Sequence, residues 1–471
     1  MRMNHPRSAG MGVSKIGASA IIFVTTLFAA LNVDGATART AAKQGLPTSQ
    51  IEDVLQTVAS DLSRKWNMSI AMAFYSESAA LGFSAAQPGE AAAAAGYTDS
   101  GMGMGMPTRK AQPDDMYVWG SITKMYTGPA VLQLVSRGVM SLDDPISVHV
   151  DPLLLKVNGT TLEDKFGTAI KQVKVHHLLH MDSGVPDYDG EEYAKAQFAH
   201  RSRDFSPIDI IGHFVSPELK EPPGTQQGYC STNYILLGLA LANHLGNGSW
   251  QEYDQKSVIP TALQRLFERS LFVNHGTCES RTPVHGFIES YSTASIPRQD
   301  VWNVSCAGGW TAGNYVGAVS DVARYTYDLY NAANSRIVTK ENLNRMLNFS
   351  KPGSSMSSFK FYGMGTFNLD WSIGAAVDIP DFPTPHQRGN YTAYGHVGDT
   401  YGYQSQTTYN PDHDFVITVA TNIETSSQAQ PAEATCLAYH NLVAMIRKEG
   451  PNRCNFTVPH RFIGICSCQR P

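Results

Sequence analysis

The stretch Val118-Trp-Gly-Ser-Ile-Thr-Lys124 leads directly into an apolar helical pattern that ends at Gly138. If Ser121 opens this helix, Lys124 follows one turn later with its side chain on the same face. A serine hydroxyl needs a base to become a nucleophile, and a desolvated lysine can serve as that base. The helix N-terminus adds free N–H groups and a positive dipole near a reacting carbonyl. The stretch therefore predicts a nucleophile–base pair at a helix start.

The Ser-x-x-Lys pattern occurs a second time, as Ser357-Ser-Phe-Lys360. No helical pattern follows this copy, because Phe361-Tyr-Gly-Met-Gly is typical of a strand and a turn. The context therefore favours the first copy. The alternative for Ser121 is an ordinary helix start with no chemical role.

A second candidate stretch, Tyr229-Cys-Ser231, stands just before a strongly apolar helical pattern that Gly246 closes. A tyrosine at this place can carry a proton between a leaving group and a base, if a nearby lysine lowers its pKa. The alternative is an ordinary loop tyrosine.

A third stretch, Tyr394-Gly-His396-Val-Gly398, begins a predicted group of late strands. Gly398 would let a ligand approach the backbone closely, and the N–H of Asp399 can contribute to an oxyanion hole. We expect His396 to contact the substrate or the tyrosine.

Taken in order, these stretches resemble the serine β-lactamase/penicillin-binding protein superfamily, and most of all its class C β-lactamase-like branch of esterases, D-aminopeptidases and DD-carboxypeptidases. Such enzymes carry a Ser-x-x-Lys helix, a Tyr-x-Asn loop and a Lys-Thr-Gly or His-x-Gly strand. The resemblance covers roughly residues 67–422. The collinear matches are residues 118–124, 142–145, 177–184, 223–238, 308–324 and 394–403.

The resemblance implies a role for each matching residue. Ser121 would be the acylated nucleophile, Lys124 its general base and Tyr229 a partner in the proton transfers. His396 would stand where the Lys-Thr-Gly lysine stands, and the N–H groups of Ser121 and Asp399 would bind the oxyanion beside Gly398. No cofactor and no metal are implied.

One position departs from the family pattern, because Ser231 stands where Tyr-x-Asn has its asparagine. A hydroxyl cannot make the two-sided hydrogen bonds of an amide to lysine and substrate. This casts more doubt on amide and lactam chemistry than on ester chemistry. It also motivates a competing hypothesis, a non-catalytic binding or scaffold protein that kept the fold.

The order of predicted elements is a helix and strands, a long helical block, and then strands and a closing helix. We expect helices at 51–66 and 431–448, and strands at 69–74, 392–396, 403–409 and 415–421. The Ala-, Gly- and Met-rich residues 85–115 indicate a flexible loop insertion. The fold class is α/β of the α+β type, a largely antiparallel sheet flanked by helices with an inserted all-helical region, as in β-lactamases and DD-peptidases.

The chain divides accordingly. We expect a signal peptide at 1–38, a linker at 39–50 and a β-lactamase-like serine hydrolase domain at 51–425, with its helical insertion at about 125–305. The closing helix and a Cys-containing tail occupy 426–471.

The N-terminus predicts export, because basic residues precede an apolar stretch and an Ala36-x-Ala38 cleavage pattern. The localisation would be extracellular or in the secretory lumen, with no membrane partner after cleavage; the alternative is a single-pass N-terminal anchor. Seven Asn-x-Ser/Thr sequons agree with a glycosylated exported chain: Asn67, Asn158, Asn247, Asn303, Asn348, Asn390 and Asn455.

An oxidising compartment makes disulfides the default for most of the seven cysteines. Cys278 and Cys306 flank one segment, and we expect them to pair. Three connectivities are open to the C-terminal cysteines, with Cys466–Cys468 the least favoured pair. Those four are Cys436, Cys454, Cys466 and Cys468. This leaves Cys230 as a predicted free thiol.

Composition excludes several function classes. The chain has 471 residues, 42% of them apolar, and a net charge of -5, so neither general disorder nor a nucleic-acid partner is expected. His176 and His180 have zinc-helix spacing, but the general-base Glu of that motif is absent. The expected partner is a small molecule or a short peptide, and the sequence does not indicate the oligomeric state.

Overall fold

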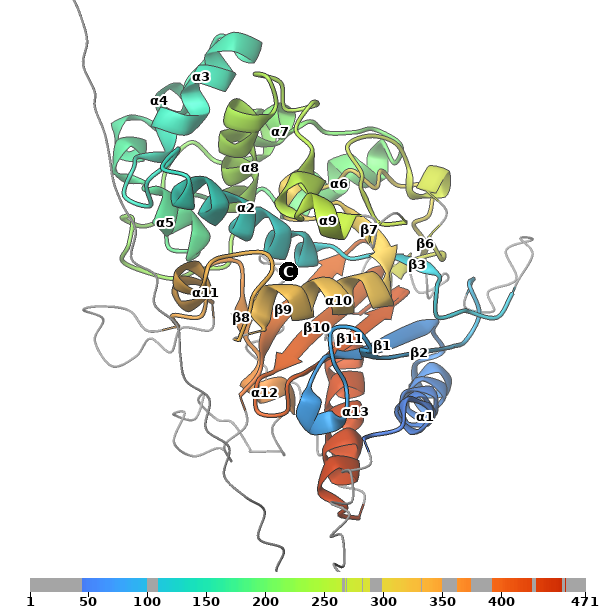
Figure 1. The fold of residues 1–471 in the computed structure, drawn as a ribbon. Coiled ribbons are helices and arrows are strands. Elements are labelled where there is room, and N and C mark those ends of the chain that lie inside the picture. The colour runs from blue at the N-terminus through green and yellow to red at the C-terminus, as the bar shows by residue number, and fades with distance from the viewer. Residues whose placement is uncertain are drawn as a thin grey trace, which may run out of the picture. The chain divides into compact units, whose positions relative to one another are not determined.

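A six-stranded antiparallel sheet with the strand order β2-β1-β11-β10-β9-β8 lies at the centre of the fold (Figure 1). The computed structural model describes residues 45–99, 109–264, 267, 269–281, 283–288, 299–331, 333–349, 362–373, 392–425, 429–450 and 454. The strands of this sheet are β1 (Ile70–Ser76), β2 (Gly89–Ala95), β8 (Phe367–Asn368), β9 (Tyr394–Thr400), β10 (Tyr403–Asn410) and β11 (Phe415–Thr421).

The central strands are buried along their whole length, because helices cover both faces of the sheet. On one face lie α1 (Thr48–Trp66) and α13 (Ala429–Arg447), and on the other lies α10 (Val319–Tyr330) (Figure 1). Helix α1 turns an apolar stripe that includes Ile51 and Leu55 toward the sheet, and both residues are fully buried.

The second part of the fold is a helical region between β3 (Met116–Val118) and β7 (Tyr315–Ala318). These two strands pair with each other, so the intervening chain leaves the sheet region and returns to the same place. The region holds α2 (Lys124–Ser136), α3 (Ile146–Asn158), α4 (Leu162–Phe166), α5 (Val175–Leu179), α6 (Glu191–Ala199), α7 (Pro207–Asp209), α8 (Thr232–Leu245) and α9 (Thr261–Gln264). Helix α8 is apolar on nearly every side and is the buried axis of this region, with α2, α3 and α5 packed around it.

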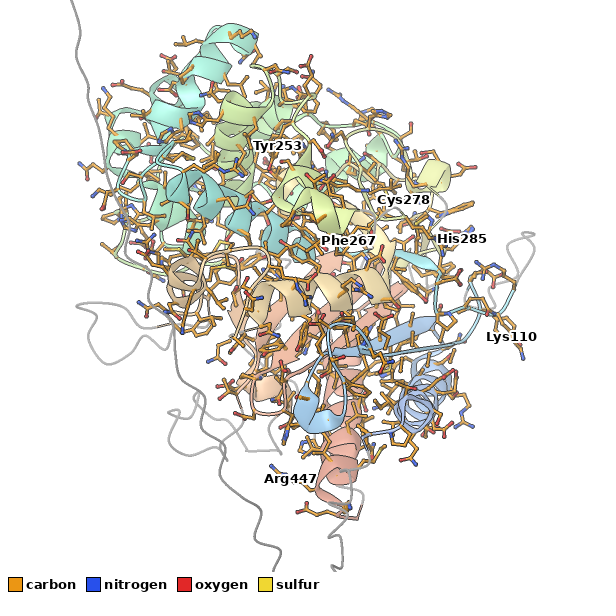
Figure 2. The ribbon with its side chains drawn as sticks, viewed as in Figure 1. Lys110, Tyr253, Phe267, Cys278, His285 and Arg447 are labelled. Carbon is orange, nitrogen blue, oxygen red and sulfur yellow. A yellow bond between two sulfur atoms is a disulfide. The ribbon has the colours of Figure 1, made fainter. Side chains whose placement is uncertain are left out.

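Short elements complete the described chain. Strand β7 also pairs with β4 (Leu271–Phe272), and β12 (Ile423–Glu424) pairs with β5 (Phe287–Ile288), which pairs in turn with β6 (Gln299–Asp300). The remaining helices are α11 (Lys340–Met346) and α12 (Asp370–Ile373). Figure 2 shows side chains packed through the space between the helices and the sheets.

The predicted fold class is confirmed, and so are the predicted helices and strands outside the Ala-rich stretch. The interpretation of residues 85–115 as a flexible loop insertion is wrong in part. Residues 89–95 form β2, which pairs with β1 in a seven-residue antiparallel register. Alanine has little intrinsic preference for strands, so pairing with β1 and packing against α1 decide this conformation. The second Ser-x-x-Lys copy, 357–360, lies outside the described residues.

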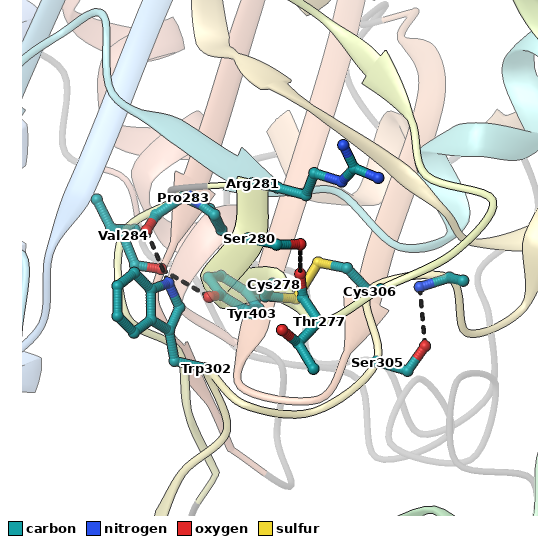
Figure 3. Close-up of a disulfide and its surroundings, with 12 residues drawn as sticks. Thr277, Cys278, Ser280, Arg281, Pro283, Val284, Trp302, Ser305, Cys306 and Tyr403 are labelled. Carbon is teal, nitrogen blue, oxygen red and sulfur yellow. Dashed lines mark hydrogen bonds between the residues drawn. A yellow bond between two sulfur atoms is a disulfide. The ribbon is translucent and has the colours of Figure 1, made fainter. Parts of the chain in front are cut away.

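Two disulfides are present among the described residues. Cys278 bonds Cys306 across a sequence separation of 28, as expected (Figure 3). Cys436 bonds Cys454. Cys230 is free and buried, also as expected. Cys466 and Cys468 lie outside the described residues.

The predicted glycosylation sites inside the described ranges lie at the surface. The five sequon asparagines inside the described ranges are all exposed: Asn67, Asn158, Asn247, Asn303 and Asn348. Asn390 and Asn455 fall outside those ranges, as does the predicted signal peptide. None of the described helices has the length and apolar character needed to cross a membrane.

The Cys278–Cys306 disulfide should contribute measurably to stability. Figure 3 shows it beside two bonds that fix its loop, from Trp302 Nε1 to Pro283 O and from Tyr403 Oη to Val284 O. Loop-closure entropy predicts that the double variant Cys278→Ser/Cys306→Ser loses about 3.5 kcal/mol of unfolding free energy. Denaturant titration of both proteins measures the loss, and identical midpoints would contradict it.

Candidate active site

The predicted nucleophile, Ser121, opens a 3₁₀ turn (Ser121–Thr123) that runs directly into α2. Gly120 precedes it with a φ of +53°, a conformation that suits glycine. A Cβ added to Gly120 would lie only 2.5 Å from the Asp399 carbonyl oxygen. The glycine therefore lets the start of this turn press against the end of β9, and the backbones of Ser121 and Asp399 come to one place.

Lys124 is fully buried and its ammonium nitrogen reaches three oxygen atoms. Nζ lies 2.8 Å from Ser121 Oγ, 3.2 Å from Ser231 Oγ and 2.9 Å from the carbonyl oxygen of Ala312. A carbonyl oxygen can only accept a hydrogen bond. A neutral Lys124 amine can therefore donate to Ala312 and Ser231 while its lone pair accepts the Ser121 hydroxyl proton. This is the geometry that a serine nucleophile with a lysine base requires.

The carbonyl of Ala312 is held by a strained turn. Trp310 in the preceding turn has a φ of +36°, an uncommon conformation for a bulky residue, and it is buried. Thr127 on α2 donates to the neighbouring Thr311 carbonyl at 2.7 Å. The turn is thus tied to the same helix that carries Lys124.

Ser231 is positioned by Asp187. The Asp187 carboxylate accepts hydrogen bonds from the backbone N–H groups of Ser231 at 3.0 Å and Thr232 at 3.2 Å, at the start of α8. An anion at a helix N-terminus is favourable in both charge and hydrogen bonding. Asn233, the nearest asparagine, instead accepts from the Ser183 hydroxyl at 2.6 Å, so Ser231 occupies the lysine contact.

Tyr229 lies beside the lysine. Its ring centroid is 5.0 Å from Lys124 Nζ, and its side chain lines the same cavity as Ser121. The structure therefore brings Ser121, Lys124, Tyr229 and Ser231 together, as the sequence predicted.

His396 lies behind Tyr229 and is fully buried. Its Nδ1 is 2.5 Å from the Val397 carbonyl oxygen, so Nδ1 carries the proton, and Tyr362 Oη at 2.9 Å then donates to Nε2. Burial, and secondarily the nearby Lys124 ammonium, hold the pKa of His396 well below its usual range. His396 is thus a neutral group with both ring nitrogens bonded inside the protein, and it is not among the residues that line the cavity.

Gly398 makes room for another segment of the protein backbone, which was not predicted from the sequence. A Cβ at this position would lie 2.0 Å from the Trp119 carbonyl oxygen. The missing side chain therefore allows β9 to approach the segment before Ser121. The close approach predicted for a ligand is made here by the chain itself.

A narrow cavity of about 60 Å³ opens onto Ser121. Aromatic rings, two carboxylates and one disulfide form much of its wall: Tyr188, Tyr193, Tyr229, Tyr401, Asp189, Asp399 and Cys278–Cys306. Such a cavity suits a small acyl or side-chain group.

No metal centre forms among the residues that the structure describes, since no group of three or more His, Cys, Asp or Glu side chains gathers to hold an ion. In the His176-His-Leu-Leu-His180 stretch, the His177 Nδ1 instead accepts from the Lys174 backbone N–H at 3.0 Å.

Several functional contacts were not predicted from the sequence. The Ala312 carbonyl leaves no side-chain signal, although it falls within the conspicuous stretch Gly308-Gly-Trp-Thr-Ala-Gly. Asp187 lies 44 residues before Ser231 in the sequence, and nothing in its local pattern indicates that its carboxylate caps α8. Tyr362 and Phe367 follow the rejected second Ser-x-x-Lys copy, and only the tertiary fold brings them to His396.

An antiparallel sheet with an inserted helical region and a buried serine–lysine pair defines a fold of the β-lactamase and penicillin-binding type. A family model described as Beta-lactamase matches residues 81–440. The chain belongs to the beta-lactamase family.

Two curated proteins illustrate the sequence likeness. Protein flp of Staphylococcus aureus is 31% identical over 134 residues, which are 28% of this chain and 24% of that protein. The D-alanyl-D-alanine-carboxypeptidase/endopeptidase AmpH of Escherichia coli is 24% identical over 155 residues, which are 33% of this chain and 37% of that protein. The chain thus matches well under half of either relative's length.

Solved structures show the fold over more of the chain. The D-amino acid amidase from Ochrobactrum anthropi SV3, in complex with L-phenylalanine amide, has a TM-score of 0.60 at 16% identity and covers 85% of this chain and 99% of its own. A penicillin-binding protein homologue from Pyrococcus abyssi has a TM-score of 0.58 at 21% identity and covers 87% of this chain and 79% of its own.

Removing the Asp187 carboxylate should affect both stability and the site. In Asp187→Ala the first N–H groups of α8 lose their acceptor, so unfolding free energy should fall by about 1 to 2 kcal/mol. Ser231 would also lose its positioning. Asp254→Ala is the matched control, since Asp254 caps another helical turn (Gln255–Val258) by accepting the Lys256 N–H and is hydrogen-bonded to neither Ser231 nor Lys124. Equal thermal stability of Asp187→Ala and the unaltered protein would count against the assignment.

The buried neutral His396 predicts a pH dependence of stability. Below pH 6.5 the unfolded chain binds a proton that the folded ring excludes, so stability is complete above that pH and is lost as pH falls. The unfolding free energy should therefore be lower at pH 5.5 than at pH 8. His396→Gln removes this titrating group and should flatten the dependence in denaturant titrations at the two pH values. A slope unchanged by the substitution would show that His396 can be protonated in the fold.

Proposed function

We propose that this protein is a secreted serine hydrolase that forms an acyl-enzyme on Ser121. The observation that carries the proposal is the 2.8 Å contact between Ser121 Oγ and Lys124 Nζ at the wall of a cavity. The hydrolase names of the amidase and carboxypeptidase relatives agree with it.

The reaction begins when Lys124 takes the Ser121 hydroxyl proton and Oγ attacks a substrate carbonyl. The N–H groups of Ser121 and Asp399 receive the oxyanion, because Gly120 brings these two backbones together. Tyr229 passes a proton from the lysine to the leaving group. Water then attacks the acyl-enzyme carbonyl while Lys124 takes a proton from it, and the bond from the acyl carbon to Oγ breaks as Lys124 returns that proton to Ser121.

Ser231 affects how strongly the site can polarise a scissile amide. Its hydroxyl contacts Lys124 at 3.2 Å and is thereby engaged on the protein side. It offers the substrate neither a second amide donor nor an amide carbonyl, so a scissile amide receives less polarisation than in the Tyr-x-Asn pattern. We propose that the substrate is an ester, or a small amide or peptide like those that the names of the relatives indicate. The narrow cavity limits the size of the group that binds beside Ser121.

Export is part of the proposal. Two disulfides support it, because disulfides persist in an oxidising compartment. Five sequon asparagines are exposed and therefore accessible to glycan attachment there. Peptide mapping of the protein from its natural secretions would detect cleavage near residue 38 and the attached glycans.

The chain provides a matched control for the nucleophile, since the Ser-x-x-Lys pattern occurs twice. Ser121→Ala should abolish labelling by a fluorophosphonate probe, and Lys124→Ala should slow it by about 10²-fold or more. Ser357→Ala and Lys360→Ala should label like the unaltered protein. Labelling that survives Ser121→Ala would refute the mechanism.

The non-catalytic alternative rests on Ser231. It predicts that the purified protein hydrolyses no member of ester, β-lactam and D-aminoacyl panels, and that the probe labels no residue. Hydrolysis that disappears in Ser121→Ala would exclude this alternative.

A further inference from the structure

The segment 362–367 packs against α2 directly beside Lys124. Gly365 has a φ of +72°, and a Cβ added to it would lie 3.0 Å from the Lys124 carbonyl oxygen. On the helix side stands Gly128, where a Cβ would lie 3.4 Å from the Gly365 Cα. Two facing glycines thus let the two backbones approach each other closely. The approach places the aromatic residues at both ends of the segment within reach of the site.

Those two residues, Tyr362 and Phe367, contact Tyr229 from two directions. The Phe367 ring stacks on Tyr229 with centroids 5.6 Å apart and an interplanar angle of 16°. The Tyr362 ring meets Tyr229 edge-on at 5.7 Å and 84°. They also pack against each other at 4.7 Å. Both arrangements are favoured for aromatic pairs and restrict how the rings can tilt.

The same two residues fix His396. Tyr362 donates to its Nε2 at 2.9 Å, and the Phe367 ring lies 4.7 Å from the imidazole. Because the Val397 carbonyl takes the Nδ1 proton, the Tyr362 hydroxyl selects one tautomer and one ring orientation. His396 in turn lies 6.4 Å from the Tyr229 ring.

Tyr229 needs this support because open space borders it on two sides. It lines the 60 Å³ cavity at Ser121 and also a second cavity of about 630 Å³ next to Cys230. Its place 5.0 Å from the lysine nitrogen therefore depends on the rings packed against it.

We propose that Tyr362 and Phe367 form an aromatic clamp that positions Tyr229 and His396 for acyl transfer at Ser121. The clamp residues are positioning residues, since they act through Tyr229 and His396. This role rests on the proposed function and extends the site to residues 362–367, whose local sequence indicates no part in catalysis.

The experiment measures the rate and saturation of fluorophosphonate labelling at Ser121, with thermal stability recorded for each protein. Phe367→Leu removes the stacked ring and should lower the limiting labelling rate by about tenfold, because a small misplacement of a proton-transfer group is costly. Tyr362→Phe removes only the hydroxyl that orients His396 and should lower it by about threefold. The half-saturating probe concentration should stay within about twofold, because probe binding is unaffected.

Two controls make the same changes in the core away from the site. Phe74→Leu removes a buried ring from β1, and Tyr327→Phe removes a hydroxyl bonded to Asp414 at 3.0 Å. Both control variants should label at the limiting rate of the unaltered protein, even where their thermal stability is lower. Clamp variants that label as fast as these controls would overturn the clamp. Failure of the unaltered protein to label at Ser121 would instead overturn the proposed function.

Discussion

The buried amine of Lys124 is the point on which the rest of the site depends. A desolvated amine is costly unless polar partners surround it, and here its own turn and two segments distant in sequence each supply an oxygen atom. Ser121 comes from the same turn, Ser231 from the start of α8 and Ala312 from the turn before β7. Each of these segments has its own anchor, Gly120, Asp187 or the strained Trp310 turn. The fold can therefore be understood as a frame that brings three oxygens to one nitrogen.

Much of this frame was predictable, because it is encoded in local patterns. The strands around Tyr403 and Phe415 are rich in β-branched and aromatic residues and are separated by a turn signal, and the apolar helix α8 ends at a glycine, so each could be recognised alone. The candidate nucleophile and base were predictable for a similar reason, since Ser121 and Lys124 share one helical turn. The β2 strand was not predictable, because its alanines become a strand only when β1 lies beside them.

The contacts that could not be predicted from the sequence are those made by backbone atoms or by segments far apart in the chain. Ala312 acts through its carbonyl, which every residue possesses. Gly398 also acts through the backbone, because its missing side chain makes room for the Trp119 carbonyl. His396 is the instructive intermediate case. Its position on β9 was predicted, but its neutral state follows from Tyr362 and from burial, and neither can be recognised in the His-x-Gly pattern.

The buried thiol of Cys230 affects which cysteines can exchange disulfides. Thiolates, not thiols, exchange with disulfides, and burial raises the pKa of this thiol while its Sγ donates to the Val185 carbonyl. In the finished protein the odd cysteine is therefore inert. Before α8 packs, nothing distinguishes it from the six other cysteines that compete for partners. Packing of Cys230 under α8 therefore removes the odd thiol from exchange with the two disulfides that the structure describes.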